Sequence, residues 1–87
     1  MEIRWSPLFE KNLKKYNPKF KEKVKQKLNL FIENKFHPSL RYKKVQALKH
    51  EDPPVKEISI NMDVRITLQE FDDFIYLRNI GGHDILS

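Results

Sequence analysis

The spacing of the apolar residues changes once along the chain, and this change restricts the fold more than any other feature. From Phe9 to Ile32 the apolar side chains recur every three or four residues, which is typical of amphipathic helices. After Pro54 they recur every two residues, which is typical of strands with one buried face. Helices first and strands later predict an α+β domain with the helices on one face of the sheet.

Two prolines mark where the helices begin. Ser6-Pro7 and Asn17-Pro18 each place a capping side chain before a proline, and proline suits the first position of a helix. The second signal predicts a new helix rather than a continuation of the first. The expected apolar stripes are Phe9, Leu13 and Tyr16, then Phe20, Val24, Leu28, Phe31 and Ile32. Two consecutive amphipathic helices indicate an antiparallel helical hairpin.

The middle of the chain has fewer regular features. His37-Pro38 ends the helical region, because the residue before a proline is disfavoured in the α conformation. Residues 40–48 show a mixed pattern, and we expect an extended segment with some strand character. Residues 50–54, which include two consecutive prolines, indicate a turn or loop.

A first strand over Glu2 to Trp5 and three later strands complete the expected sheet. The inward positions of the later strands are Ile58 and Ile60, then Val64, Ile66 and Leu68, then Ile75, Leu77 and the next alternate residue, Asn79. Residues 61–63 and 70–73 form the turns between them, and Gly81-Gly82 ends the last strand. The prediction is one α+β domain over residues 1–87 with the order β-α-α-β-β-β, a helical hairpin packed on a mostly antiparallel sheet.

The size and the absence of cysteine exclude several classes of protein. At 87 residues the chain can build one modest core, and its apolar runs are too short to span a bilayer. No secretory signal is visible at Met1. The absence of cysteine excludes disulfides, thiol nucleophiles and thiolate metal sites, so the expected location is the cytoplasm.

Charge is divided unevenly along the chain. Residues 1–50 contain 14 basic and 4 acidic residues, whereas residues 51–87 contain 3 basic and 8 acidic ones. A basic half joined to an acidic half indicates a surface that faces a polyanion, with nucleic acid as one candidate. The alternative is a lysine-coated helix whose charges only keep the protein soluble.

Known sequence motifs for nucleotide binding and for zinc binding are missing, and the three histidines lie far apart in the sequence. Scattered histidines are more often surface residues than metal ligands, so we expect no metal ion and no cofactor. Polar residues at the ends of the late strands are better candidates: Asp63, Arg65, Arg78 and His83. Two arginines with a histidine suit a phosphate group, because guanidinium binds its oxygens and imidazole transfers a proton. Alternatively, the two arginines only pair with Asp63, Glu57 or Asp84 across the sheet.

Three motifs in order resemble the RelE/ParE superfamily of toxins. They are the segments 37–41 (HPSLR), 59–66 (SINMDVRI) and 77–84 (LRNIGGHD), and the start FEKNLKKY also fits. The sequence is most similar to the branch that contains YafQ-like messenger-RNA interferases, and the resemblance covers nearly the whole chain. It implies a β-α-α-β-β-β fold, a cognate antitoxin partner and metal-independent cleavage of messenger RNA in the ribosome.

The resemblance also assigns roles to residues. His83 is the candidate general acid, Asp63 the base or the residue that orients a histidine, and His37 a second proton carrier. Arg65 is expected to bind the scissile phosphate, with Arg78 as a second phosphate ligand. The remaining expected phosphate contacts, which would hold ribosomal RNA together with the helix lysines, are Arg41, Lys43 and Lys44.

Two positions depart from the pattern of the relatives. Lys43 stands where many relatives have a second histidine, and Ser87 stands where many have an aromatic residue that can stack on a base. Tyr42 or Tyr76 could stack instead, although strand aromatics are more often core residues. Two alternatives to a nuclease therefore stay open: a non-enzymatic toxin that poisons DNA gyrase, as ParE-like proteins do, and an inactive relative that only binds an antitoxin.

Overall fold

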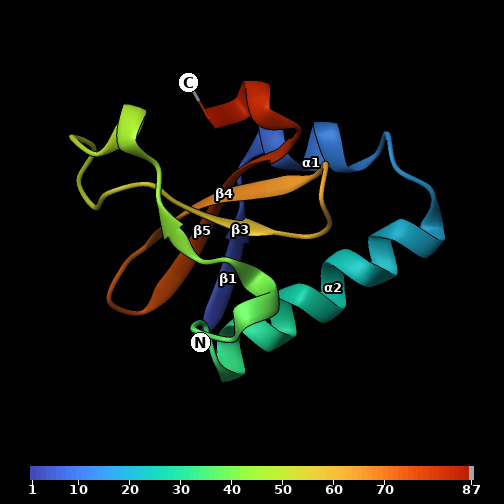
Figure 1. Cartoon of the computed structure of the whole chain (residues 1–87), viewed down its shortest axis with the longest axis horizontal. Coiled ribbons are helices and arrows are strands. Elements are labelled where there is room, and N and C mark those ends of the chain that lie inside the picture. Colours follow the sequence, from blue (N-terminus) through green and yellow to red (C-terminus); the bar gives the residue numbers. More distant parts are fainter. Residues whose placement is uncertain (87) are drawn as a thin grey trace.

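Five strands form one sheet in the order β1-β5-β4-β3-β2 (Figure 1). The computed structural model describes residues 1–86 of the chain. β1 pairs with β5 in parallel and all other neighbouring pairs are antiparallel, so the predicted mostly antiparallel sheet is confirmed. The strands are β1 (Glu2–Trp5), β2 (Lys43–Lys44), β3 (Lys56–Ser59), β4 (Arg65–Glu70) and β5 (Phe74–Gly81).

The two helices begin at the predicted cap-then-proline signals. α1 spans Pro7–Leu13 and α2 spans Pro18–Glu33. The Ser6 hydroxyl accepts a hydrogen bond from the amide of Phe9 (2.9 Å), and the Asn17 side chain accepts one from the amide of Phe20 (2.8 Å). Three short 3₁₀ helices follow, namely η1 (Pro38–Leu40), η2 (Gln46–Leu48) and η3 (His83–Leu86). In Figure 1, α1 and η3 lie together at one end of the sheet.

The main core lies between the helices and one face of the sheet. Phe9, Val24, Leu28 and Phe31 supply its helical side, and the inward residues of β3, β4 and β5 supply its sheet side. The α+β architecture is thus confirmed. The mixed segment 40–48 contains only the two-residue strand β2 between η1 and η2, so its predicted strand character is limited to the pairing of Lys43 and Lys44 with β3.

The prediction that Asn79 is an inward residue of the last strand is wrong. Thr67 pairs with Asn79, but the next residue of β4, Leu68, pairs with Leu77, so Arg78 is an extra residue in β5. This bulge shifts the alternation by one position. Ile80 is therefore buried in the core, whereas Asn79 is only half-buried.

Hydrogen bonds from α1 hold the bulge. The Ser6 hydroxyl donates to the backbone carbonyl of Arg78 (2.6 Å), and the Asn12 side-chain amide donates to Oδ1 of Asn79 (2.6 Å). Because Ser6 also caps α1, one side chain fixes both the start of the helix and the irregularity of β5.

The opposite face of the sheet is polar. We define this polar face by the alternate residues Glu57, Ser59, Arg65, Thr67 and Gln69 of β3 and β4. The segment that follows β2 covers part of it: Val45 and Val55 are buried, and the Gln69 side-chain amide donates to the carbonyl of Pro53 (2.8 Å). Within residues 1–86, no helix combines the length and the apolar character needed to cross a membrane.

Four side chains near the end of α2 form a charged network. The Tyr42 hydroxyl donates to Glu70, Lys35 Nζ lies 2.9 Å from the other oxygen of Glu70, and Lys56 Nζ donates to the Tyr42 hydroxyl (3.0 Å). Burial, the hydrogen bond to Glu70 and its charge all raise the pKa of Tyr42. Burial acts to raise the pKa of Glu70 as well, but the hydrogen bonds from Tyr42 and Lys35 and the charges of Lys35 and Lys56 outweigh it and lower that pKa.

We predict that Tyr42→Phe lowers the free energy of unfolding by about 1 kcal/mol at neutral pH, because it removes a half-exposed hydrogen bond to a charged group. The contribution of Glu70 is present above its unfolded pKa of 4.5 and is lost as the pH falls through its lower folded pKa. The contribution of Tyr42 is present below its unfolded pKa of 10.0 and is lost as the pH rises beyond it. Denaturant unfolding of the wild type and of Tyr42→Phe, carried out from below pH 4.5 to above pH 10.0, measures the difference in their free energies of unfolding.

The matched control is Tyr16→Phe. Tyr16 stacks on Phe20 with ring centroids 4.7 Å apart, and its hydroxyl makes no hydrogen bond within residues 1–86. We expect its effect to be small and independent of the ionisation of Glu70. An equal loss of stability in both variants would show that the Tyr42–Glu70 hydrogen bond contributes nothing.

Candidate active site on the polar face of the sheet

Arg65 begins β4 and is the most buried cation on the polar face. Its side chain is 12% exposed, and its Nε lies 3.3 Å from Oε1 of Glu57. Its Nε and Nη1 atoms are buried and have no hydrogen-bond partner within the described residues. Buried guanidinium nitrogens without hydrogen bonds are costly, so the charge of Arg65 requires a balancing anion close by.

Glu57 is the carboxylate that balances this cation. It lies on β3 and is only 2% exposed, opposite Lys43 of β2, whose Nζ is 3.7 Å from Oε1 of Glu57. The ion pair between Arg65 and Glu57 across the sheet, which is one part of the alternative drawn from the sequence, is present. Lys43 is 64% exposed and therefore contributes less to the balance of charge than Arg65 does.

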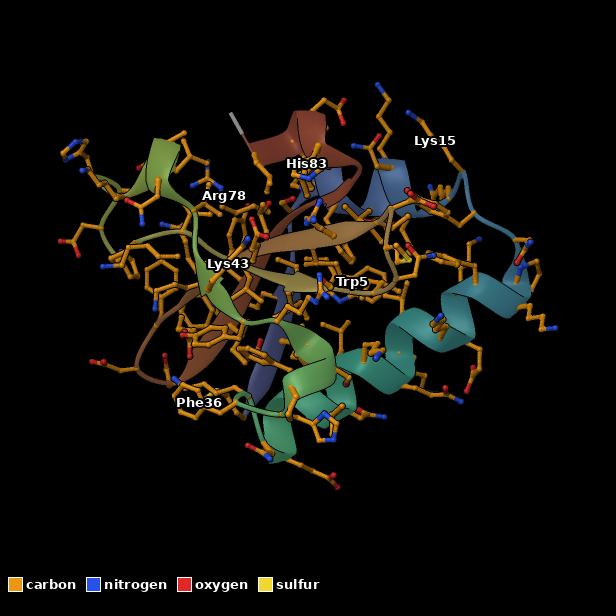
Figure 2. The ribbon with its side chains drawn as sticks, in the orientation of Figure 1. Trp5, Lys15, Phe36, Lys43, Arg78 and His83 are labelled. Atoms are coloured by element: carbon orange, nitrogen blue, oxygen red, sulfur yellow. The ribbon has the colours of Figure 1, made fainter. Side chains whose placement is uncertain are left out.

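The end of β5 lies next to the start of β4. Gly81 pairs with Arg65, and a Cβ atom added to Gly82 would lie 3.7 Å from the carbonyl oxygen of Asp63. His83 follows directly and begins η3 (Figure 2). The structure thus brings Asp63, Arg65 and His83 to one end of the sheet, with the side chains of Asp63 and His83 exposed.

Gly81 allows this arrangement. A Cβ atom at this position would lie 2.9 Å from Cγ2 of Ile85, closer than real side chains approach, so any larger residue here would require the Ile85 side chain of η3 to shift.

His37 lies directly before η1 and contacts Ser39. Its Nδ1 accepts a hydrogen bond from the amide of Ser39 (3.2 Å) and lies 2.9 Å from the Ser39 hydroxyl. Ser39 and Arg41 line a hollow of about 230 Å³ together with Arg65. Nδ1 of His37 is thus used in a local turn, and only Nε2 is available for proton transfer.

Arg78 and Lys44 are not brought to this hollow. Arg78 lies in the bulge of β5, donates to Oε1 of Gln69 (3.1 Å), and lines a separate groove of about 510 Å³ with Ser6, Tyr76 and Asn79. The predicted pairing of Arg78 with a carboxylate across the sheet is therefore replaced by a hydrogen bond to an amide. Lys44 pairs with Lys56, so the alternation of β2 places it on the face opposite Lys43.

Only one of the two positions that depart from the relatives lies within the residues that the structure describes. Lys43 lies beside Glu57 on the polar face, whereas Ser87 lies outside the described residues. Tyr42 belongs to the network with Glu70 and packs against Phe31, with ring centroids 5.7 Å apart, so it is a structural residue here.

Reasoning from the sequence gave no functional role to three residues near Arg65. Glu57 was considered only as a pairing partner, and Lys27 and Ser39 were not considered individually although both line the hollow with Arg65. Polar residues at positions 57 and 59, alternating with Ile58 and Ile60, could have indicated the polar face. Within residues 1–86, no three His, Asp or Glu side chains lie close enough to form a metal site.

The fold is shared with three solved toxin structures. The metal-bound toxin from Helicobacter pylori is 22% identical, with a TM-score of 0.74 over 100% of this chain and 99% of that one. YafQ in the Escherichia coli DinJ–YafQ complex is 18% identical, with a TM-score of 0.76 over 98% and 96%. The YoeB dimer from Staphylococcus aureus is 17% identical, with a TM-score of 0.75 over 95% and 97%. No protein-family model and no curated protein sequence matches the chain.

These similarities extend over nearly the whole length of each chain. At identities below 25% they establish the fold alone, which is the fold of these three proteins and agrees with the one that the sequence motifs imply. The resemblance is therefore confirmed at the level of the fold.

We predict that Glu57→Gln lowers the free energy of unfolding by about 2 kcal/mol, because it leaves the buried Arg65 guanidinium without a balancing charge. Lys43→Gln should cost less than about 1 kcal/mol, because Lys43 is mostly exposed. Denaturant unfolding of the two single variants and the double variant measures both effects and their coupling. An equal loss from the two single variants would contradict the dominance of the Glu57–Arg65 pair.

Proposed function

We propose that the protein is the toxin of a toxin–antitoxin pair and a metal-independent endoribonuclease that cleaves messenger RNA at the ribosome. The observation that carries the proposal is the position of Arg65, Asp63 and His83 at one end of the sheet. The fold supports it, because YafQ and YoeB have the same architecture and YafQ occurs in a toxin–antitoxin complex with DinJ.

The chemistry that fits these residues is attack of a ribose 2′-hydroxyl on the adjacent phosphorus. The 2′-oxygen forms a bond to phosphorus, the 5′-oxygen of the next nucleotide leaves, and the product is a 2′,3′-cyclic phosphate. The partly exposed guanidinium of Arg65 would donate to the phosphoryl oxygens as negative charge develops. Asp63 would accept the proton of the 2′-hydroxyl, and His83 would donate a proton to the leaving oxygen.

His37 is the second candidate proton carrier. The hydrogen bond from the amide of Ser39 to Nδ1 fixes its ring, so that Nε2 would exchange the proton. Arg78 would bind a more distant phosphate of the same strand in its own groove. Lys43 and Lys44 would bind phosphates of ribosomal RNA, with an affinity that falls as salt rises.

An apolar groove beside β1 is the surface proposed for the antitoxin. It has a volume of about 680 Å³, and Ile3, Trp5, Leu13, Val24 and Leu28 contribute to its wall. β1 is an edge strand of the sheet, and Trp5 is 49% exposed. An amphipathic antitoxin segment could cover the apolar side chains and pair with the free edge of β1.

For the nuclease activity we predict growth arrest on expression in bacteria, with new messenger-RNA ends that primer extension maps in register with codons. Arg65→Ala should reduce cleavage about 100-fold or more, because it removes stabilisation of the transition state. His83→Gln should reduce cleavage about 100-fold or more, because it removes the general acid. Circular dichroism checks that both variants fold.

The matched controls are His50→Gln and Arg4→Gln. His50 is exposed and lies in the loop before β3, and Arg4 pairs with Glu2 at the surface. Both variants should cleave like the wild type. Growth arrest with intact messages would overturn the nuclease in favour of a ParE-like poison of DNA gyrase, and no arrest would favour an inactive antitoxin-binding relative.

For the antitoxin groove we predict a shift of the tryptophan fluorescence of the complex to shorter wavelength. Trp5 is the single tryptophan of the chain, and covering its exposed half removes water from the ring. The measurement compares the free protein with its complex with a tryptophan-free antitoxin. An unchanged spectrum in a stable complex would show that the antitoxin binds elsewhere.

A further inference from the structure

A second group of cations lines the hollow beside Arg65. The hollow has a volume of about 230 Å³ and lies between α2, the end of η1 and the turn from β3 to β4. It opens where the two-residue strand β2 ends, because β2 pairs only with Lys56 and Glu57 and leaves the rest of the edge of β3 uncovered. Its volume is nearly eight times the ~30 Å³ of a water molecule, so it can hold a small hydrated anion.

Donors without acceptors converge on this hollow. Lys27 from α2, Arg41 from the end of η1 and Arg65 from β4 all line it, and none of the described lining residues is acidic. The charged groups of Lys27 and Arg41 make no hydrogen bond or ion pair within residues 1–86, whereas Arg65 has Glu57 as its partner. The excess of positive charge therefore lies on the side of Lys27 and Arg41.

Asn61 adds an oriented donor. Its side-chain oxygen accepts hydrogen bonds from the amides of Asp63 and Val64, at 2.8 Å each. Because the oxygen is held by the turn, the NH₂ group is the part of the side chain that remains available to a ligand in the hollow.

The backbone of Arg41 is held in a left-handed conformation, with φ 49° and ψ 44°. Its amide donates to the carbonyl of Pro38 (3.3 Å) and closes η1. Glycine adopts this conformation without steric cost, whereas arginine does not. An arginine at a position that favours glycine indicates that its side chain is needed there.

We infer that this hollow, the Lys27–Arg41 site, binds a phosphate group. In the proposed nuclease, on which this identification of the ligand rests, the group is the RNA backbone phosphate next to the one that Arg65 contacts. A free phosphate ion has the same chemistry, and the experiment separates the two sources. The site would fix the register of the RNA strand, because two neighbouring phosphates would be held at once.

The first arm titrates the full-length protein with inorganic phosphate and follows the backbone amide signals of residues 39–41 and 61 by NMR. Lys27→Gln and Arg41→Gly should each weaken binding roughly tenfold, because each removes a charge-assisted contact. Arg41→Gly should retain the fold and the thermal midpoint, since glycine suits the backbone. The matched control is Lys19→Gln, an exposed lysine of the same helix that does not line the hollow.

The second arm measures binding of a short single-stranded RNA with 2′-O-methyl groups, which cannot be cleaved, at several salt concentrations. Lys27→Gln and Arg41→Gly should each reduce the slope of log affinity against log salt by about 0.7, and Lys19→Gln should not. If only binding of inorganic phosphate is weakened, the site exists and its ligand is free phosphate. If neither arm separates the two variants from Lys19→Gln, the site is overturned.

These outcomes are independent of the nuclease assay. A protein that cleaves messenger RNA and does not bind phosphate at Lys27 and Arg41 would overturn the site alone. A protein that binds phosphate there and leaves messages intact would overturn the nuclease alone.

Discussion

One extra residue in β5 determines where the polar side chains of the candidate site lie. Without the bulge at Arg78, strict alternation would turn Asn79 into the core and Ile80 out of it. With the bulge, Ile80 is buried, while Asn79 remains half-buried and bonded to Asn12 of α1. The strand then continues to Gly81 opposite Arg65, and His83 follows beside the turn that contains Asp63. The candidate catalytic end therefore depends on an irregularity that Ser6 and Asn12 hold from the other end of the chain.

The balance of charge on the polar face is the second feature on which the candidate site depends. Glu57 is almost fully buried and pairs with Arg65, which allows a guanidinium to be held inside the sheet surface. One carboxylate faces two cations, Arg65 and Lys43, and the hollow next to them adds Lys27 and Arg41. The excess of cations favours an anionic ligand, and the buried carboxylate fixes the orientation of the arginine that would bind it.

Much of the fold could be predicted from the sequence, because local signals determine it. Ser6-Pro7 and Asn17-Pro18 mark both helix starts, and the alternation after Pro54 predicts three strands. The alternation could not predict the burial of Ile80, because the bulge depends on Ser6 and Asn12, more than 60 residues away in sequence. Likewise, the sequence motifs made Asp63, Arg65 and His83 candidates for the site. Lys27 could not be identified in this way, because in the sequence it resembles any other helix lysine. Only the packing of η1 and the β3–β4 turn beside it distinguishes it.

The uneven distribution of charge along the chain has a structural consequence at this site. The acidic half contains Asp63, Arg65 and His83, which are the proposed base, phosphate ligand and acid, in that order. The basic half contributes Lys27, Arg41 and Lys43, which surround the same arginine from α2, η1 and β2. Neither half of the sequence contains both of these groups of residues. The proposed chemistry therefore requires α2 and η1 to be packed against the sheet. Folding itself would then assemble the site, since the cations that bind the strand and the groups that transfer protons meet only in the complete domain.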